Sequence, residues 1–310
     1  MDNNSDIIIV CAVDNPYAMM ATTMIKSIQH NHQGDGIVHV YLIDNGLTKR
    51  SKRKLISSVK SPIIKIIWLH VNDYTLRLLS IDNYFQALST HYYRLLIPYL
   101  IPEKISKVIY LDCDLLAMVD IKELWKEKFD GNVICAVQDS RVKIVSCRWG
   151  GIKNYQKLGL DSETKFFNSG VLLIDLKKWR EKRISEKVLR CNEDNKDYVI
   201  WDNKETNSEN ALLNVQNKKF VKYHDQYGLN VVLSNMWKEL DPRWNQFPEE
   251  ADFNTFILHY AGRNPIDQDY DGKYKELFLK YLDMTIWRLY EQGPLIRIAK
   301  KIISTLPFFD

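Results

Sequence analysis

Two carboxylates separated by one residue are the strongest chemical signal in this sequence. Asp112 and Asp114 flank Cys113 and come directly after Ile105–Leu111, which we expect to form a buried strand. Side chains two positions apart in an extended chain point the same way, so both carboxylates can share one divalent cation. Alone, such a pattern fits a solvated turn about equally well. The end of a buried strand favours a bound partner, because two unpaired acids are costly there.

The elements around this pair predict an α/β fold. Short apolar runs alternate with helical patterns, with strands expected at 7–13, 38–43, 63–69, 105–111, 133–137 and 171–176 and helices at about 17–30, after 48 and at 91–99. Such alternation is typical of a parallel sheet with crossover helices. In open sheets of this kind, ligands bind beyond the carboxyl ends of the strands, where Asp112 and Asp114 lie.

The bulk composition narrows the class of protein. The chain has 310 residues, of which 45% are hydrophobic and 26% charged, enough for a full core. Its net charge of +4 comes without a dense basic block, so we do not expect nucleic-acid binding. Five scattered cysteines, without the spacing of a zinc site, favour a reducing cytoplasm. The apolar runs are too short for a signal sequence or a bilayer span.

Two longer motifs accompany the aspartate pair, each with an apolar strand beside polar residues. They are Val108–Asp114, followed by Asp120 and Leu124-Trp125, and Phe167–Leu176, followed by Trp179-Arg180. Through these motifs the chain, from about Ile7 to Gly262, resembles family 8 of the retaining glycosyltransferases, the group with bacterial lipooligosaccharide galactosyltransferases and glycogenin. The resemblance implies a GT-A fold, which is Rossmann-like with a mostly parallel central sheet flanked by helices.

The resemblance also implies an activity: a retaining hexosyltransferase that moves galactose or glucose from a UDP-sugar to a glycan acceptor on a protein or lipid. In the family the D-x-D carboxylates and the His of a late H-Y/F-x-G motif bind Mn²⁺, and His259-Tyr260-Ala261-Gly262 matches that motif. We therefore expect Asp112, Asp114 and His259 to bind Mn²⁺, which an imidazole favours, or Mg²⁺. Without the other motifs, a lone His259 would be expected to be a packed, hydrogen-bonded imidazole.

The family pattern assigns further residues to the donor. The expected donor-binding set is Ala12, Asp14, Tyr17, Arg94, Asp112, Cys113, Asp114, Asn168, Ser169, His259, Gly262 and Arg263. Ala12, Asp14 and Tyr17 match positions that hold uracil and ribose. Arg94 matches a basic residue beside the donor, and Asn168 and Asp139 match residues that orient the sugar, so the last two are catalytic candidates. Alternatives are a helix cap for Asp14, a surface position for Arg94 and a turn residue for Asp139.

A third catalytic candidate is Glu209. It lies in Ser208–Asn214, which we align with the family motif D-Q/E-D-x-L-N, at the position on the β-face of the donor sugar. A carboxylate there can stabilise an oxocarbenium-like centre or attack it. The same segment also fits a helix N-terminus with Glu209 in its first turn, and the two roles are compatible.

Departures from the family pattern keep other functions open. Pro16 stands where the pattern has Asn, Ser208 and Asn210 replace acids, and Arg263 or Asn264 replaces only in part a Lys that contacts the diphosphate. A non-catalytic UDP-sugar-binding protein is therefore one alternative. A metal-dependent phosphatase is another, because phosphatases of the haloacid dehalogenase type also place D-x-D after an apolar strand.

We expect two parts along the chain, a GT-A catalytic domain at 1–262 and a basic amphipathic helical tail at 263–310. Apolar residues from Leu277 to Tyr290 recur at helical spacing before Gly293-Pro294 ends the pattern. The basic and apolar stripes of 273–309 fit peripheral contact with a membrane about as well as packing on the domain. We expect a cytoplasmic protein, with the inner face of the membrane as the surface that such a tail would contact.

Overall fold

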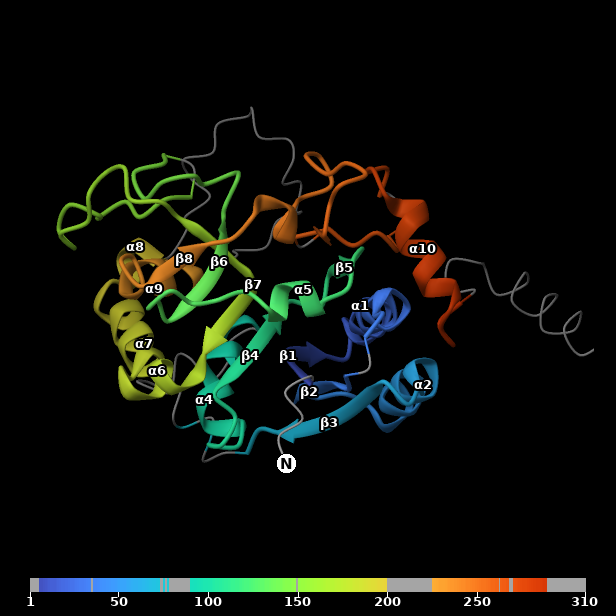
Figure 1. Ribbon diagram of the computed structural model, residues 1–310. Helices are drawn as coiled ribbons and strands as arrows, with labels where there is room; N and C mark the ends of the chain where they lie inside the picture. The colour runs from blue at the N-terminus through green and yellow to red at the C-terminus, as the bar shows by residue number, and fades with distance from the viewer. Residues whose placement is uncertain are drawn as a thin grey trace, which may run out of the picture. The chain divides into compact units, whose positions relative to one another are not determined.

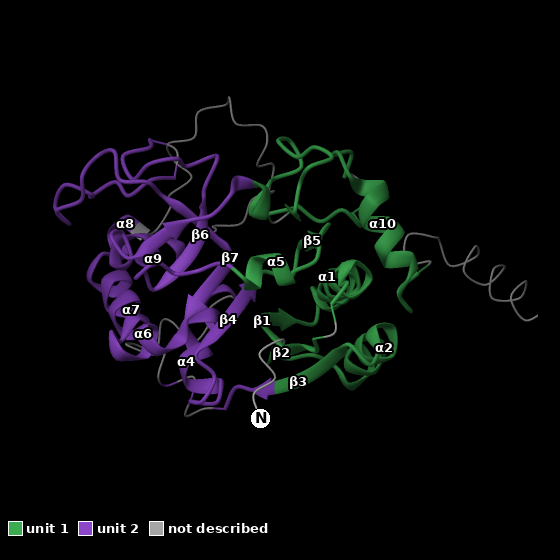
Figure 2. Cartoon of the chain, viewed as in Figure 1, with its two compact units in different colours: residues 1–68, 111–126, 243–310 green, residues 69–110, 127–242 purple. Residues whose placement is uncertain are grey.

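The computed structural model describes residues 6–34, 36–72, 75, 77, 90–148, 150–199, 225–261, 263–267 and 270–288. Figure 2 shows that the chain folds into two compact units, each built from segments far apart in the sequence. Unit 1 comprises Met1–Trp68, Leu111–Lys126 and Arg243–Asp310, and unit 2 comprises Leu69–Tyr110 and Glu127–Pro242. The predicted division of the chain after residue 262 is a division along the sequence and stays a prediction.

Unit 1 contains alternating strands and helices, as the sequence predicts. They are β1 (Ile7–Asp14), α1 (Ala18–Asn31), β2 (Val38–Asn45), α2 (Lys49–Val59) and β3 (Ile64–His70), whose last two residues pass into unit 2. β1 and β2 are parallel, and β2 lies between β1 and β3 (Figure 1). α2 starts where Thr48 accepts a hydrogen bond from the backbone N–H of Ser51, which caps the first turn.

Three later elements complete the described core of unit 1. They are β5 (Leu115–Ala117), β9 (Ile257–His259) and α10 (Lys275–Asp283), and α5 (Lys122–Trp125) follows β5. β5 and β9 form a two-stranded antiparallel sheet. The apolar side of α10 packs against α1, with Phe278 and Leu282 in one buried cluster with Met19 and Met20 (Figure 1). This packing is what stabilises a nine-residue helix that is marginal in water by itself.

Unit 2 contains four strands that pair side by side, together with several helices. Its strands and helices are η2 (Thr90–Leu96), α4 (Ile97–Leu100), β4 (Lys107–Leu111), β6 (Ile134–Gln138), β7 (Phe167–Asp175), α6 (Leu176–Glu181), α7 (Ile184–Asp194), α8 (Lys196–Val199), α9 (Asp225–Val232) and β8 (Trp237–Glu239), with η5 (Pro242–Asn245) at the boundary. Along the sheet β7 lies between β4 and β6, and β8 follows β6. Helix α7 packs against α6 and α9, and α6 and α9 both contact β7.

The sheet is mostly parallel, as predicted, but β7 is an exception. β6 is parallel to β8 and antiparallel to β7, with a register shift between Ala136 and Val137. The predicted helix at 91–99 begins as a 3₁₀ turn and becomes α-helical only at α4, whose first turn accommodates Pro98 without losing a hydrogen bond. In the part of the chain that the structure describes, no helix has the length and apolar character needed to cross a bilayer.

Candidate metal centre and polar network

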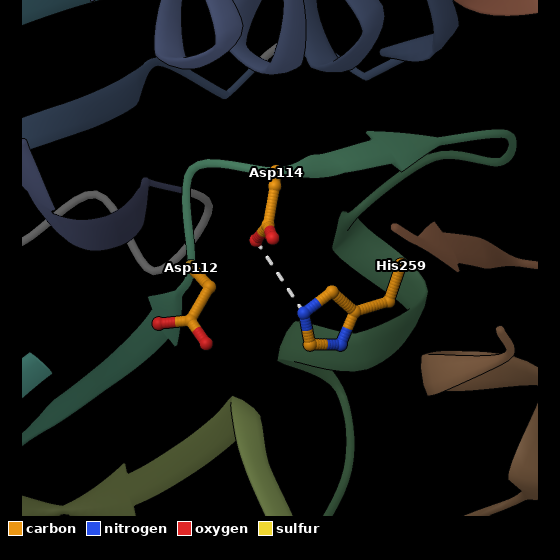
Figure 3. A group of neighbouring side chains, drawn as sticks. All are labelled: Asp112, Asp114 and His259. Carbon is orange, nitrogen blue, oxygen red and sulfur yellow. Dashed lines mark ion pairs between the residues drawn. The ribbon is translucent and has the colours of Figure 1, made fainter. Parts of the chain in front are cut away.

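The three predicted metal ligands come together in unit 1. One ligand atom from each of Asp112, Asp114 and His259 lies within 4.8 Å of the other two (Figure 3). Asp114 and His259 are buried, and Nε2 of His259 lies 3.4 Å from Oδ1 of Asp114. Two carboxylates and one imidazole are a donor set that suits Mn²⁺ or Mg²⁺, and the residues therefore fit the cation that the sequence predicts.

Strand pairing explains how His259 reaches the aspartates. β5 begins directly after Asp114, and its first residue, Leu115, pairs with His259 at the end of β9. The backbone N–H of Tyr260 also donates to the carbonyl of Asp114 over 3.0 Å. Because these are backbone contacts, the register of the small sheet sets the distance between the two side chains.

A further residue, Asn245, orients the imidazole. Oδ1 of Asn245 lies 2.8 Å from Nδ1 of His259, and both side chains are buried. An amide oxygen only accepts hydrogen bonds, so Nδ1 carries the proton and Nε2 keeps its lone pair on the side of Asp114. Metal-binding histidines are commonly held in this way by a partner on their other ring nitrogen.

The predicted uridine residues lie at the carboxyl end of β1. Ala12 is buried in the strand, and Oδ1 of Asp14 accepts a hydrogen bond from the backbone N–H of Tyr17 over 3.1 Å. Asp14 thus supports the turn before α1 but does not cap the helix as the alternative predicts, because the N-cap position is Tyr17, which forms no side-chain capping bond. Burial, followed by the Asp114 carboxylate, raises the pKa of Tyr17 to about 12, so its phenol is neutral at physiological pH.

Cys113, between the two aspartates, has a different character. A hydrogen bond with Cys11, together with burial, raises the pKa of the Cys113 thiol well above its usual range. The group of possible ligand atoms that the structure brings together comprises Asp112, Asp114 and His259 and does not include the Cys113 thiol.

Unit 2 brings two other predicted residues together at the ends of β6 and β7. Nδ2 of Asn168 donates to Oδ2 of Asp139 over 3.0 Å. Oδ1 of Asp139 accepts from the backbone N–H groups of Arg141 and Val142, as the turn alternative predicts. Asp139 is buried, and these bonds fix the orientation of its carboxylate.

Gln226, at the start of α9, joins this pair. Its Oε1 accepts hydrogen bonds from the backbone N–H and the hydroxyl of Ser169, each over 3.0 Å. Its Nε2 lies 3.4 Å from Oδ2 of Asp139. One turn later Asn230 exchanges two hydrogen bonds with the backbone of Phe167. The helix is therefore fastened to β7 through polar side chains as well as by apolar packing.

Arg94 is buried in unit 2, so the surface alternative does not hold. Its side chain is 2% exposed, and Nε lies 2.7 Å from Oδ2 of Asp225, which is equally buried. Nη1 donates to the carbonyl of Ser169, and the guanidinium stacks 4.5 Å from the centre of the Tyr110 ring. A charge this deeply buried needs such a partner, because an isolated ion in a protein interior is strongly destabilised.

Three remaining site predictions have a different outcome. Glu209 and Gly262 lie outside the described residues. Arg263 is about one third exposed and forms an ion pair with Glu249. Arg263 therefore stays a prediction as a ligand for the diphosphate.

Comparison with known proteins places these residues in context. The model of glycosyl transferase family 8 matches residues 8–264. General stress protein A of Bacillus subtilis is 28% identical over 307 residues, which cover 90% of this chain and 94% of that protein. A putative glycosyltransferase of Haemophilus influenzae is 26% identical, with 83% and 71% of the two chains covered.

A solved structure also matches. The galactosyltransferase LgtC, solved with donor and acceptor sugar analogs, has a TM-score of 0.70 and 23% identity, covering 95% of this chain and 100% of LgtC. This likeness confirms the GT-A fold that the sequence predicts.

Sequence reasoning missed Asn245, Asp225, Gln226 and Asn230. The last three do carry a signal: Asp225-Gln226-Tyr227-Gly228-Leu229-Asn230 fits D-Q/E-D-x-L-N with only Tyr227 departing. A side chain at Gly228 would meet Asn192 on α7 at 2.4 Å, which explains the glycine. Asn245 belongs to no motif in the sequence, and only the fold shows its role.

Proposed function

The chain belongs to glycosyl transferase family 8, and from this premise we propose that it is a retaining hexosyltransferase that uses Mn²⁺ to transfer galactose or glucose from a UDP-sugar to a glycan acceptor on a protein or lipid. The observation that carries the proposal is the cluster of Asp112, Asp114 and His259 with Asn245 behind the imidazole. Such a cluster is costly to build for stability alone, because it gathers two acids in a half-buried place.

Unit 1 would bind the nucleotide end of the donor. A cation held by Asp112, Asp114 and His259 would stabilise the charge that develops on the departing diphosphate. Ala12, Asp14 and Tyr17 would contact uracil and ribose at the end of β1. The neutral phenol of Tyr17 can donate a hydrogen bond and adds no charge that opposes the diphosphate.

The sugar is the other part of the donor. Asn168 and Asp139 would bind its hydroxyls, and the hydrogen bonds between these two side chains already limit their rotation before the donor arrives. The pair of Arg94 and Asp225 would act through Ser169, whose carbonyl accepts from Arg94. In this proposal Arg94 positions the backbone of β7 rather than carrying charge to the donor.

Two side chains are candidates for the role beside the anomeric carbon. Glu209 is the candidate from the sequence, and its carboxylate would allow a covalent intermediate. Gln226 is a second candidate, favoured by its bonds to Ser169 and Asp139. An amide is a poor nucleophile, so Gln226 would stabilise the oxocarbenium-like centre while the acceptor attacks from the side that UDP leaves.

The cellular setting is a further part of the proposal. Five free cysteines support a cytoplasmic location. The apolar side of α10 is already used in packing on α1, so any contact of residues 273–309 with the inner face of the membrane would involve the outer side of α10 or the segment beyond it. The alternatives, a UDP-sugar-binding protein and a phosphatase, are separated by the experiment below.

The experiment measures UDP release from UDP-galactose, UDP-glucose and related donors, with Mn²⁺ or EDTA. Wild type is compared with Asp114→Asn and with Asp283→Asn, an exposed position at the end of α10. We expect one hexose donor to give Mn²⁺-dependent UDP that only the first variant loses. UDP binding without turnover across an acceptor panel would instead indicate a binding protein, and phosphate release without UDP a phosphatase.

The same assay separates the two side chains beside the anomeric carbon. If Glu209 is the nucleophile, Glu209→Gln loses turnover and retains UDP binding, while Gln226→Ala mainly weakens sugar binding. If Gln226 holds the role, Gln226→Ala loses turnover and Glu209→Gln stays near wild type.

A further inference from the structure

A cavity lies in unit 1, with a volume of about 410 Å³. Its lining residues come from the turn after β1, from the first turns of α1 and α2 and from the segment after α10, and they are Asn15, Pro16, Met19, Thr48, Arg50, Ser51, Lys54 and Trp287. None of the residues expected to bind the metal or the uridine lines it. Its volume is within the usual range of small-molecule sites, about 300–1,000 Å³.

The charged residues that line the cavity are all basic. Arg50 and Lys54 contribute two cations, Thr48 and Ser51 two hydroxyls, and no lining residue is acidic. Arg50 is exposed, and within the described part of the chain it forms no ion pair with a carboxylate. Nζ of Lys54 lies 4.0 Å from the centre of the Trp287 ring, which holds this cation at the wall of the cavity.

The walls are held in place by hydrogen bonds. Oδ1 of Asn15 accepts from the hydroxyl of Ser51 over 2.8 Å and from the backbone N–H of Thr48 over 3.1 Å. These bonds join the turn after β1 to the start of α2. On the opposite side, the backbone N–H of Ile286 donates to the hydroxyl of Ser58 over 3.0 Å, which places Trp287 beside α2. The cavity is therefore part of the folded structure of unit 1.

Trp287 supplies an independent sign of a ligand. Its indole Nε1 is buried and has no hydrogen-bond partner in the part of the chain that the structure describes. Buried donors are nearly always paired, because an unmade hydrogen bond costs about 1–3 kcal/mol. Trp287 lines the cavity, so a molecule bound there would lie beside this donor.

We propose that this cavity binds a phosphate ester. A tetrahedral phosphate offers several acceptor oxygens for the cations of Arg50 and Lys54 and for the indole N–H. The volume exceeds what phosphate alone fills, so the ligand carries an organic part as well. The ester can be a soluble compound or the headgroup of an anionic lipid, and both present the same chemistry to these residues.

The test measures binding of glycerol 3-phosphate by calorimetry in EDTA, which removes the cation from the predicted donor site. Arg50→Gln/Lys54→Gln is compared with Arg53→Gln/Lys60→Gln, which removes the same charge from exposed positions of α2 and of the residue after it. We expect the first variant to weaken binding about tenfold or more and the second less than about threefold. Trp287→Phe, which removes only the donor and keeps the ring, should lie between them.

Vesicles distinguish the two sources of the ligand. Binding to vesicles with phosphatidic acid, lost in Arg50→Gln/Lys54→Gln and absent with phosphatidylcholine, would assign a lipid headgroup, whereas binding of glycerol 3-phosphate alone would assign a soluble ester. The proposal is overturned if neither probe binds, if both paired variants weaken binding equally, or if UDP displaces glycerol 3-phosphate in EDTA. UDP release and thermal unfolding, measured on the same variants, keep this result separate from the proposed transferase activity.

Discussion

The metal cluster of unit 1 and the polar network of unit 2 handle buried charge in opposite ways. In unit 1, Asp112 and Asp114 lie together beside an imidazole, and the negative field reaches the phenol of Tyr17. In unit 2 each buried acid has its own partner: Asp139 accepts a hydrogen bond from Asn168, and Asp225 forms an ion pair with Arg94. A cluster of like charges favours a cation from solution, while a neutralised network is already complete and can only orient what binds to it.

The largest expected effect is on the free energy of unfolding, when the buried ion pair of unit 2 loses its cation. Arg94→Met leaves the Asp225 carboxylate buried without its ion-pair partner, and we expect it to lower the free energy of unfolding by about 3–5 kcal/mol. Arg183→Met, which breaks an ion pair with Glu186 on the surface, should cost less than about 1 kcal/mol. Urea unfolding of the two variants measures both. Equal losses would show that the buried pair does not neutralise unit 2 as inferred.

The corresponding change in unit 1 should affect activity and not stability. Asp114→Asn removes one ligand and one charge, and we expect Mn²⁺-dependent UDP release to fall on the order of 100-fold. Because the variant also relieves repulsion within the cluster, its melting temperature without metal should equal or exceed that of wild type. A metal-free variant that melts well below wild type would contradict the comparison.

The support of His259 gives a smaller effect. Asn245→Ala removes the acceptor at Nδ1 and leaves all three metal ligands in place, so we expect Mn²⁺ affinity to fall by about 10–100-fold. A Mn²⁺ titration of UDP release measures it, and Asn254→Ala, at an exposed position in the same unit, is the control. Unchanged affinity in Asn245→Ala would show that strand pairing alone orients the imidazole.

The smallest effect is in the titration of Tyr17. The raised pKa, about 12, comes first from burial and then from Asp114, so Asp114→Asn should move it part of the way back to the ordinary value of 10.0. Tyrosinate absorbance, with Tyr17→Phe as the blank, follows this group. Because the pKa of Tyr17 is higher in the folded protein, its contribution to the free energy of unfolding is fully present below pH 10 and is lost as pH rises toward 12. An unshifted pKa would mean that burial alone raises it.

Local patterns in the sequence predicted much of the fold and of unit 1. Alternating apolar runs located β1, β2 and β4 within a few residues, because strand and helix periods are local properties of the chain. The exception is β7, which starts at Phe167, four residues before the apolar run begins. Its first residue, Phe167, is hydrogen-bonded by a side chain of α9. Because α9 is distant in the sequence, the hydropathy of the residues around Phe167 does not reveal this contact.

By itself the sequence predicted the three candidate metal ligands, since Asp112 and Asp114 follow a strand and His259 lies in a recognisable motif. Only the tertiary structure decided how they meet, through the pairing of β5 with β9, and that Asn245 stands behind the imidazole. In unit 2, too, only the tertiary structure shows that Arg94 forms an ion pair with Asp225 and that Gln226 accepts a hydrogen bond from Ser169. Residue types and spacings are local, whereas the partner of a buried polar group is chosen by chain segments that become neighbours only on folding.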